Sequence, residues 1–337
     1  MLIRPVLIRP GRDSDAAGVI ALIGRCWADY PNCILDVEDE PGLLAPASTY
    51  AAQGGPLWVA EDAGVVIGMV ATVPQGGGDW EVCRVYAHPD LHGTGLGRRL
   101  LDTAEAHAAG AGATRLHLWT DTRFDRAHRF YEKRGYVRTG PIRALDGVPD
   151  VLEFGYAKPI EGVQVLDAAG AASAVRALAD ILVACVDGGA GISFLAPLEP
   201  AAARSHMAKA ARDVAQGRCV LLAAWSRGVL AGTVRVQLDM AQNQPHRAEI
   251  AKLLVHPAHR GRGLARALMA AAEAEATRAG RTLLTLDTRT GDAGERLCHR
   301  LGWTEAGHIP GYAVTMDGTL HGTTIFYKTI VAWSEVA

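Results

Sequence analysis

One stretch of this sequence occurs twice, and the repeat limits which folds the chain can adopt. Residues 85–100 and residues 253–268 align without a gap at an offset of 168 positions, and the register persists as far as Leu118 and Leu286. Chance does not maintain a register over this length. A chain of 337 residues is also long enough for two domains of ordinary size. The repeat therefore predicts two similar domains in tandem, residues 1–159 and 163–337.

Each copy joins a hydrophobic strand to an alanine- and leucine-rich helix through a turn that contains glycines. The first amides of a helix have no partner within the helix and carry the positive end of its dipole. Glycines at such a turn let a phosphate approach the backbone closely. In the second copy Arg260, Arg262 and Arg266 flank the turn. The pattern predicts a phosphate-binding site in each copy, and a glycine-rich turn without a ligand is the alternative.

The spacing of the glycines selects among phosphate ligands. A dinucleotide fold would show G-x-G-x-x-G with a later acidic residue, and a P-loop would end in Gly-Lys-Ser/Thr, but neither is present. Residues 260–265 (RGRGLA) instead resemble the R/Q-x-x-G-x-G/A motif with which the GNAT family of N-acetyltransferases binds acetyl-CoA. Residues 92–97 (HGTGLG) follow the same pattern, with His92 in place of arginine or glutamine.

The resemblance implies acetyl-CoA as the cofactor and assigns its contacts by position in the motif. In the second copy these are Leu254, Val255, Arg260, Gly261, Arg262, Gly263, Leu264, Ala265 and Arg266. In the first copy they are Val85, Tyr86, Ala87, His92, Gly93, Thr94, Gly95, Leu96, Gly97 and Arg98. The family's donor to the thioester carbonyl oxygen is a backbone N–H before the loop, at Leu253 or Leu254 and at Val85 or Tyr86.

The fold class implied is α/β of the mixed α+β kind: two GNAT-type domains, each a mixed, mostly antiparallel sheet flanked by helices. Hydrophobic alternation predicts an antiparallel strand pair at 57–61 and 65–73, and again at 219–225 and 229–237. Apolar periodicity predicts helices at 96–109, 171–186 and 200–216. Residues 158–162 (KPIEG) are interpreted as a short linker between the domains.

Composition excludes several classes of partner. The net charge is −2, and no run of lysine and arginine is long enough to follow a nucleic-acid backbone. No apolar run approaches 18 residues, so we expect no membrane span. The six cysteines show no CxxC pair and no metal-ligand spacing, which indicates a reduced, cytoplasmic protein without a metal site. The sequence leaves the oligomeric state open.

Acetylation of an amine requires a base, because a lysine-like amine has a pKa near 10.4 and must lose a proton before it attacks. Glu81 and Glu249 occupy identical places in the repeat, each on the strand that leads to the loop. Asp287 ends the next strand in the second copy only, where the first has Trp119. These carboxylates are the candidate bases. A strand-end carboxylate that is only solvated, or paired with an arginine, is the alternative.

Residues 188–190 (GGA), 247–255 (RAEIAKLLV), 286–288 (LDT) and 310–312 (PGY) make the second copy similar to the tabtoxin resistance protein, an acetyltransferase that inactivates a β-lactam toxin. This likeness implies Glu249 and Asp287 as catalytic carboxylates. The family usually places a tyrosine acid on the helix before the Gly-aromatic exit. The first copy has Tyr131 there, whereas the second has Cys298, which we interpret as either a weak acid or a packing residue.

The sequence thus predicts an acetyl-CoA-dependent N-acetyltransferase for a primary amine of a small molecule, with the second domain as the main catalytic one. An amino acid-like toxin or antibiotic is one candidate acceptor. An acyl-CoA-binding module with one or both domains silent is the first alternative. A protein N-acetyltransferase is the second, although the chain shows no extended charged groove signal for a peptide.

Overall fold

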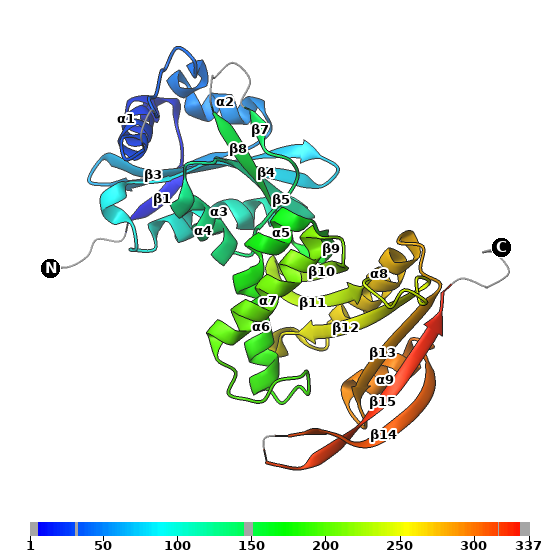
Figure 1. Cartoon of the computed structure of the whole chain (residues 1–337). Helices are drawn as coiled ribbons and strands as arrows, with labels where there is room; N and C mark the ends of the chain where they lie inside the picture. The colour runs from blue at the N-terminus through cyan, green and yellow to red at the C-terminus, as the bar shows by residue number, and fades with distance from the viewer. Residues whose placement is uncertain (1–5, 31–32, 145–150, 316, 331–337) are drawn as a thin grey trace. The chain divides into compact units, whose positions relative to one another are not determined.

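The computed structural model describes residues 6–30, 33–144, 151–315 and 317–330 (Figure 1). The chain divides into two compact units. The first unit contains Met1–Arg129 and Gly140–Ile160, and the second contains Phe130–Thr139 and Glu161–Ala337. Within the described residues, no helix combines the length and the apolar character that a membrane span needs.

The first sheet has the strand order β1-β2-β3-β4-β5-β8-β6, and β7 also pairs with β8. Its only parallel pair among those with a described register is β4–β5, while β1–β2, β2–β3, β3–β4, β5–β8 and β7–β8 are antiparallel. The strands are β1 Leu7–Pro10, β2 Leu57–Asp62, β3 Val65–Gly76, β4 Asp79–Ala87, β5 Arg115–Asp121, β6 Val137–Arg138, β7 Arg143–Ala144 and β8 Leu152–Pro159.

Helices cover both faces of this first sheet because β3, an inner strand, is apolar on both sides. Met69, Ala71 and Val73 of β3 join the core cluster of α1. Gly68 lies on the opposite face, where a Cβ atom would meet the side chain of Leu100 in α3 at 2.7 Å. The helices are α1 Ala16–Trp27, α2 Pro46–Ala52, α3 Leu96–Gly110 and α4 Asp125–Lys133.

The second sheet has the order β14-β15-β13-β12-β11-β10-β9, with β12–β13 as its parallel pair. The strands are β9 Glu161–Leu166, β10 Cys219–Ser226, β11 Val229–Gln237, β12 Arg247–Val255, β13 Leu283–Arg289, β14 Thr304–Val314 and β15 Leu320–Thr329. The helices are α5 Ala168–Ser173, α6 Val175–Asp187, α7 Pro200–Ala215, α8 Leu264–Arg278 and α9 Ala293–Arg300.

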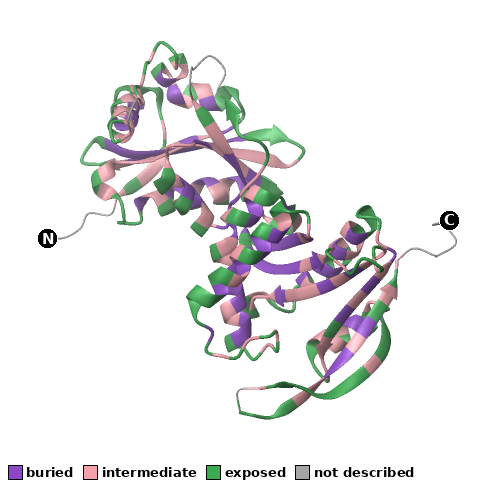
Figure 2. Ribbon diagram, viewed as in Figure 1, coloured by how far each residue is buried: buried purple, intermediate pink, exposed green. Residues whose placement is uncertain are grey.

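Alternation along β10 shows how the second sheet is covered. Leu221, Ala223 and Trp225 belong to the core cluster that contains α6 and α7, whereas Leu222 and Ala224 belong to the cluster that contains α8. Figure 2 shows β10 and β11 as largely buried and β14 as largely exposed. The expected α/β class, with mixed and mostly antiparallel sheets flanked by helices, is confirmed in both units.

Two expectations about local structure were wrong. The helix expected at 171–186 is two helices, α5 and α6, with Ala174 between them, and α5 begins three residues earlier than expected because Asp167 caps it by accepting the N–H of Gly170 at 2.7 Å. The expected linker at 158–162 is mostly strand, since β8 ends at Pro159 and β9 begins at Glu161. Lys158 is 3% exposed and pairs with Glu105, so this segment is held rather than free.

Candidate active site

The two glycine turns have the same geometry. β4 is followed by a 3₁₀ turn at Pro89–Leu91 and then by α3, and β12 is followed by a 3₁₀ turn at Pro257–His259 and then by α8. The φ angles of all four glycines lie in the left-handed region, and a Cβ added to any of them would meet no atom of the described residues within 4 Å: Gly93 (φ 82°), Gly95 (φ 89°), Gly261 (φ 77°) and Gly263 (φ 80°). Both turns therefore need glycine for their conformation and are open in front of it.

Helices α3 and α8 start from glycine caps, which suits an anionic ligand. Gly95 and Gly263 are the N-cap residues, and neither has a side chain that could accept a hydrogen bond from the first amides. Open space, uncapped amides and a helix N-terminus are what a pyrophosphate requires. The residues of both turns thus fit the phosphates of a coenzyme A ligand.

The two turns differ in charge. Arg260, Arg262 and Arg266 are all exposed, and Arg266 has no ion pair among the described residues. In the first unit His92 takes the place of Arg260. Burial and the neighbouring Arg126 lower the pKa of the His92 imidazole, so this ring is neutral at pH 7. Arg98 lies 4.0 Å from a carboxylate oxygen of Asp102. The second turn is the more cationic of the two.

The strand before each turn separates from its parallel neighbour. β12 pairs with β13 over Arg247–Glu249 only, although β12 continues along β11 to Val255 and β13 continues along β15 to Arg289. In the first unit β4 pairs with β5 over Asp79–Glu81 only. Beyond Glu249 and Glu81 the facing edges of these strands have no ladder partner in the part of the chain that the structure describes, and Figure 1 shows β12 and β13 diverging.

A β-bulge lies just beyond each point of separation, which sequence reasoning missed. The register of β3–β4 shifts between Met69 and Ala71, and that of β11–β12 shifts between Thr233 and Arg235. The residues Arg84 and Lys252 have φ 55° each, a conformation that is costly for a residue with a side chain. They are equivalent in the repeat. A bulge leaves its extra residue unpaired, so the ladder of each strand is interrupted at this point.

Glu249 and Asp287 lie on the same face of the second sheet. Glu249 is in register with Thr285, and Asp287 is two residues further along β13, so alternation returns its side chain to that face. Glu249 is half-buried, and its carboxylate forms no hydrogen bond or ion pair among the described residues. Asp287 is exposed and accepts the hydroxyl proton of Thr323 at 3.0 Å. The structure therefore places the two carboxylates that the sequence singled out on one face of neighbouring strands.

Glu81 is placed like Glu249 but has different surroundings. Burial raises the pKa of the Glu81 carboxyl above its usual range, and Gln75 donates to this carboxylate at 3.0 Å. No second carboxylate stands at the Asp287 position, where the guanidinium of Arg143 covers the ring of Trp119 at 3.8 Å. The first unit thus has one candidate base and the second unit has two.

Neither candidate acid is exposed. The side chain of Tyr131 is 7% exposed, and its ring lies 5.4 Å from that of Phe130 and 5.8 Å from that of Tyr136. Cys298 is 4% exposed within the α8 core cluster, and burial raises the pKa of its thiol to about 11. Of the two interpretations of Cys298, the structure favours packing.

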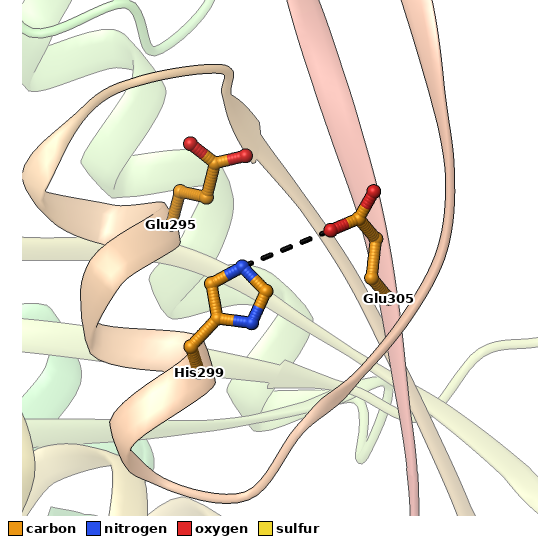
Figure 3. A group of neighbouring side chains, drawn as sticks. All are labelled: Glu295, His299 and Glu305. Atoms are coloured by element: carbon orange, nitrogen blue, oxygen red, sulfur yellow. Dashed lines mark ion pairs between the residues drawn. The ribbon is translucent and has the colours of Figure 1, made fainter.

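One group in the described residues has metal-ligand character, although the sequence predicts no metal site. Glu295 and His299 of α9 lie near Glu305 of β14, and the His299 Nε2 atom is 3.7 Å from a carboxylate oxygen of Glu305 (Figure 3). Glu295 already accepts the N–H of Gly291 at 2.5 Å and the hydroxyl of Thr324 at 2.8 Å. These bonds lower the pKa of the Glu295 carboxyl and tie it to the start of α9.

Comparison with protein families decides the assignment. The model of the acetyltransferase (GNAT) family matches residues 25–136 and again residues 192–303. The two matches together span more than half of the chain, and each contains one glycine turn. The chain belongs to the GNAT family. Acetyl-CoA is the cofactor of this family, in agreement with the fit of the two turns. The finer likeness of the second copy to the tabtoxin resistance protein remains a prediction.

Curated relatives match only part of the chain. A mycothiol acetyltransferase of Thermobispora bispora is 31% identical over 141 residues, which are 38% of this chain and 44% of the relative. An IAA acetyltransferase of Azospirillum brasilense is 34% identical over 103 residues, which are 30% of this chain and 66% of the relative. The matched segments therefore span 44% and 66% of the lengths of these two relatives.

Solved structures match about half of the chain. The structure of yncA from Salmonella typhimurium, which contains its cofactor acetyl-CoA, has a TM-score of 0.44 and 23% identity, and covers 51% of this chain and 95% of its own. An acetyltransferase from Streptococcus agalactiae has a TM-score of 0.42 and 21% identity, and covers 47% of this chain and 99% of its own.

Proposed function

We propose that this chain is an N-acetyltransferase that transfers the acetyl group of acetyl-CoA to a primary amine of a small molecule, and that the second unit is the main catalytic one. The observation that carries the proposal is a coincidence of features in that unit. The more cationic glycine turn, the point where β12 leaves β13, and the carboxylates of Glu249 and Asp287 all belong to one strand and its neighbour.

Each part of the second unit has a role in this chemistry. The cofactor supplies an electrophilic acetyl carbon on a thioester. The amides of Gly263, Leu264 and Ala265, with the arginines of the turn, hold its phosphates. Glu249 accepts a proton from the ammonium form of the acceptor, which makes the nitrogen nucleophilic. Asp287 lies on the same face and attracts that ammonium. The N–H of Leu253 or Leu254, next to the bulge, stabilises negative charge on the carbonyl oxygen.

No side-chain acid is assigned to the second unit. Cys298 is buried, and its raised pKa makes it a weaker acid than an ordinary thiol. The thiolate of coenzyme A is a good leaving group, so the reaction proceeds without one. A separate observation bears on the cellular compartment. All six cysteines are free thiols, which supports a reducing, cytoplasmic environment for the protein.

For the first unit we propose a different role, that of a domain that binds acetyl-CoA with little turnover. It has the glycine turn and Glu81 but lacks the second carboxylate. Tyr131, the candidate acid of the first sequence copy, is buried and belongs to the second unit. In this arrangement one unit performs chemistry while the other holds cofactor.

The test is a screen of primary amines, including amino acids, polyamines and short peptides, against the whole chain with acetyl-CoA. Release of free thiol that depends on the amine, together with a mass increase of the amine by one acetyl group, is the expected result. A chain that binds acetyl-CoA but acetylates no small amine contradicts the proposal, and acetylation confined to peptides would favour a protein N-acetyltransferase.

A further inference from the structure

Two cations of the second unit, Arg235 and Lys252, lie near the candidate carboxylates. Arg235 comes from β11 and Lys252 from the bulge of β12. With His206 and Met207 of α7 they line a recess at the surface of the sheet, together with Thr233 and Leu221. We refer to Arg235 and Lys252 as the cation pair. No motif in the sequence marks either residue.

The cation pair and the carboxylates share one face of the sheet. Val234 and Val236 belong to the core cluster of α8, so Arg235 between them faces the side of α6 and α7. Ala248 and Ile250 belong to the α8 cluster as well, so Glu249 also faces the α6 and α7 side. An acceptor bound there would meet negative charge toward β13 and positive charge toward β11.

Among the described residues, no carboxylate forms an ion pair with either member of the cation pair. The Nε atom of Arg235 is buried without a hydrogen-bond partner, and in the described part of the chain Arg235 forms no ion pair. Lys252 donates to the carbonyl of Ile192 at 3.1 Å and to the hydroxyl of Ser193 at 2.8 Å, both neutral oxygens. Glu249 and Asp287 act on Lys252 through space, but neither is ion-paired with it in the described structure.

The first unit satisfies the equivalent positions internally. Arg84, the counterpart of Lys252, is bound by both carboxylate oxygens of Glu40. The counterpart of Arg235 is Ala71, because Ala71 pairs with Cys83 as Arg235 pairs with Ala251. One unit therefore supplies its own carboxylate to the bulge cation, and the other leaves two cations without one. Unpaired cations next to a reaction site are costly unless a ligand neutralises them.

Resting on the proposed function, we infer that the cation pair binds a carboxylate of the acceptor, so that the second unit acetylates an amine that also carries a carboxylate. A guanidinium matches a planar carboxylate with parallel hydrogen bonds. The carboxylate that binds Arg84 in the first unit shows the same chemistry within the chain. Ammonium toward Glu249 and carboxylate toward Arg235 would orient such an acceptor across the strands.

The experiment compares amino acids with the amines formed by removing their carboxylate, and with the corresponding aminophosphonates. For the parent chain we expect loss of the carboxylate to raise KM at least about 10-fold. Arg235→Gln should raise KM for the amino acid by about 10- to 100-fold, with little change in kcat or in acetyl-CoA affinity, and should not affect the decarboxylated amine. Arg235→Lys should restore part of the difference.

Lys209→Gln is the matched control, since it removes an exposed cation of α7 that pairs with Asp213 instead. An equal KM for amino acid and amine would overturn the inference, as would an equal effect of Arg235→Gln on both. Preference for the phosphonate would show a different anion class. Thermal shifts of parent and Arg235→Gln with the same compounds need no turnover. A carboxylate-dependent thermal shift without acetyl transfer would therefore contradict the proposed function and leave the inference standing. The absence of a carboxylate-dependent shift would contradict the inference.

Discussion

Single residues separate the two units more than their folds do. Glu249 and Glu81 hold the same place on equivalent strands, yet the neighbouring strand carries Asp287 in the second unit and Trp119 at the equivalent position in the first. The bulge residues diverge in the same way, because Arg84 is bound by Glu40 and Lys252 by neutral oxygens. Duplication preserved the positions, and the residues around them set their chemistry.

Removal of the base tests the division between the units. Glu249→Gln keeps the size of the side chain but cannot accept the proton, so turnover should fall by about 10²-fold or more while acetyl-CoA affinity stays nearly unchanged. Glu81→Gln is the matched control and should have a much smaller effect. Steady-state kinetics and calorimetry on both variants provide the measurement. The opposite ranking would make the first unit the enzyme.

His206 gives the second unit a pH dependence of stability. Burial, reinforced by Arg235 and Lys252, lowers the pKa of its imidazole to about 4 from 6.5. Between these values the unfolded chain binds a proton that the folded chain does not, so the free energy of unfolding falls as pH drops from about 6.5 to about 4. His206→Gln should flatten this part of the profile in urea unfolding. An equal slope in parent and variant would contradict the assignment, and the exposed His299→Gln is the control.

At the scale of elements, the strand, glycine turn and helix form the working part of each unit. Gly263 begins α8 with φ 80°, where a β-branched residue is strained and its side chain would project into the open space before the helix. Gly263→Val should therefore weaken acetyl-CoA binding in the second unit at least about 10-fold. Titration calorimetry measures this directly. Gly280→Val, at φ 71° after the same helix, is a control for strain without a ligand nearby, and equal losses from both variants would argue against a phosphate site.

The elements that could be predicted from the sequence are those whose signals are local. Glycine spacing revealed the turn before α8, and the constant register of the repeat aligned Glu249 with Glu81. The bulge at Lys252 could not be predicted, because it depends on how β11 and β12 register in the sheet. Arg235 belongs to no sequence motif. It stands out only in the structure, where no described carboxylate forms an ion pair with it. The start of α5 could have been predicted as well, because aspartate favours the N-cap position and Asp167 occupies it.

At the scale of the whole molecule, two units of one family imply two cofactor sites with unequal work. We expect titration calorimetry of the parent chain to give two acetyl-CoA molecules per chain. Gly95→Val and Gly263→Val should each leave one. Acetyl transfer should survive the first change and be lost with the second. A stoichiometry of one in the parent, or equal loss of activity in both variants, would contradict this division of labour.

The short pairing between β12 and β13 has a mechanical consequence. Three residue pairs join β12 to β13, whereas seven join β13 to β15. The second sheet therefore has two parts, β9 to β12 and β13 to β15, that are connected by a short ladder. We expect the short ladder to open locally, so that amide hydrogens of β13 and β15 exchange with solvent faster than those of β10 and β11. Hydrogen–deuterium exchange followed by mass spectrometry compares the two groups. Acetyl-CoA should slow this exchange, because a ligand bound where β12 and β13 separate would contact both strands and oppose their opening.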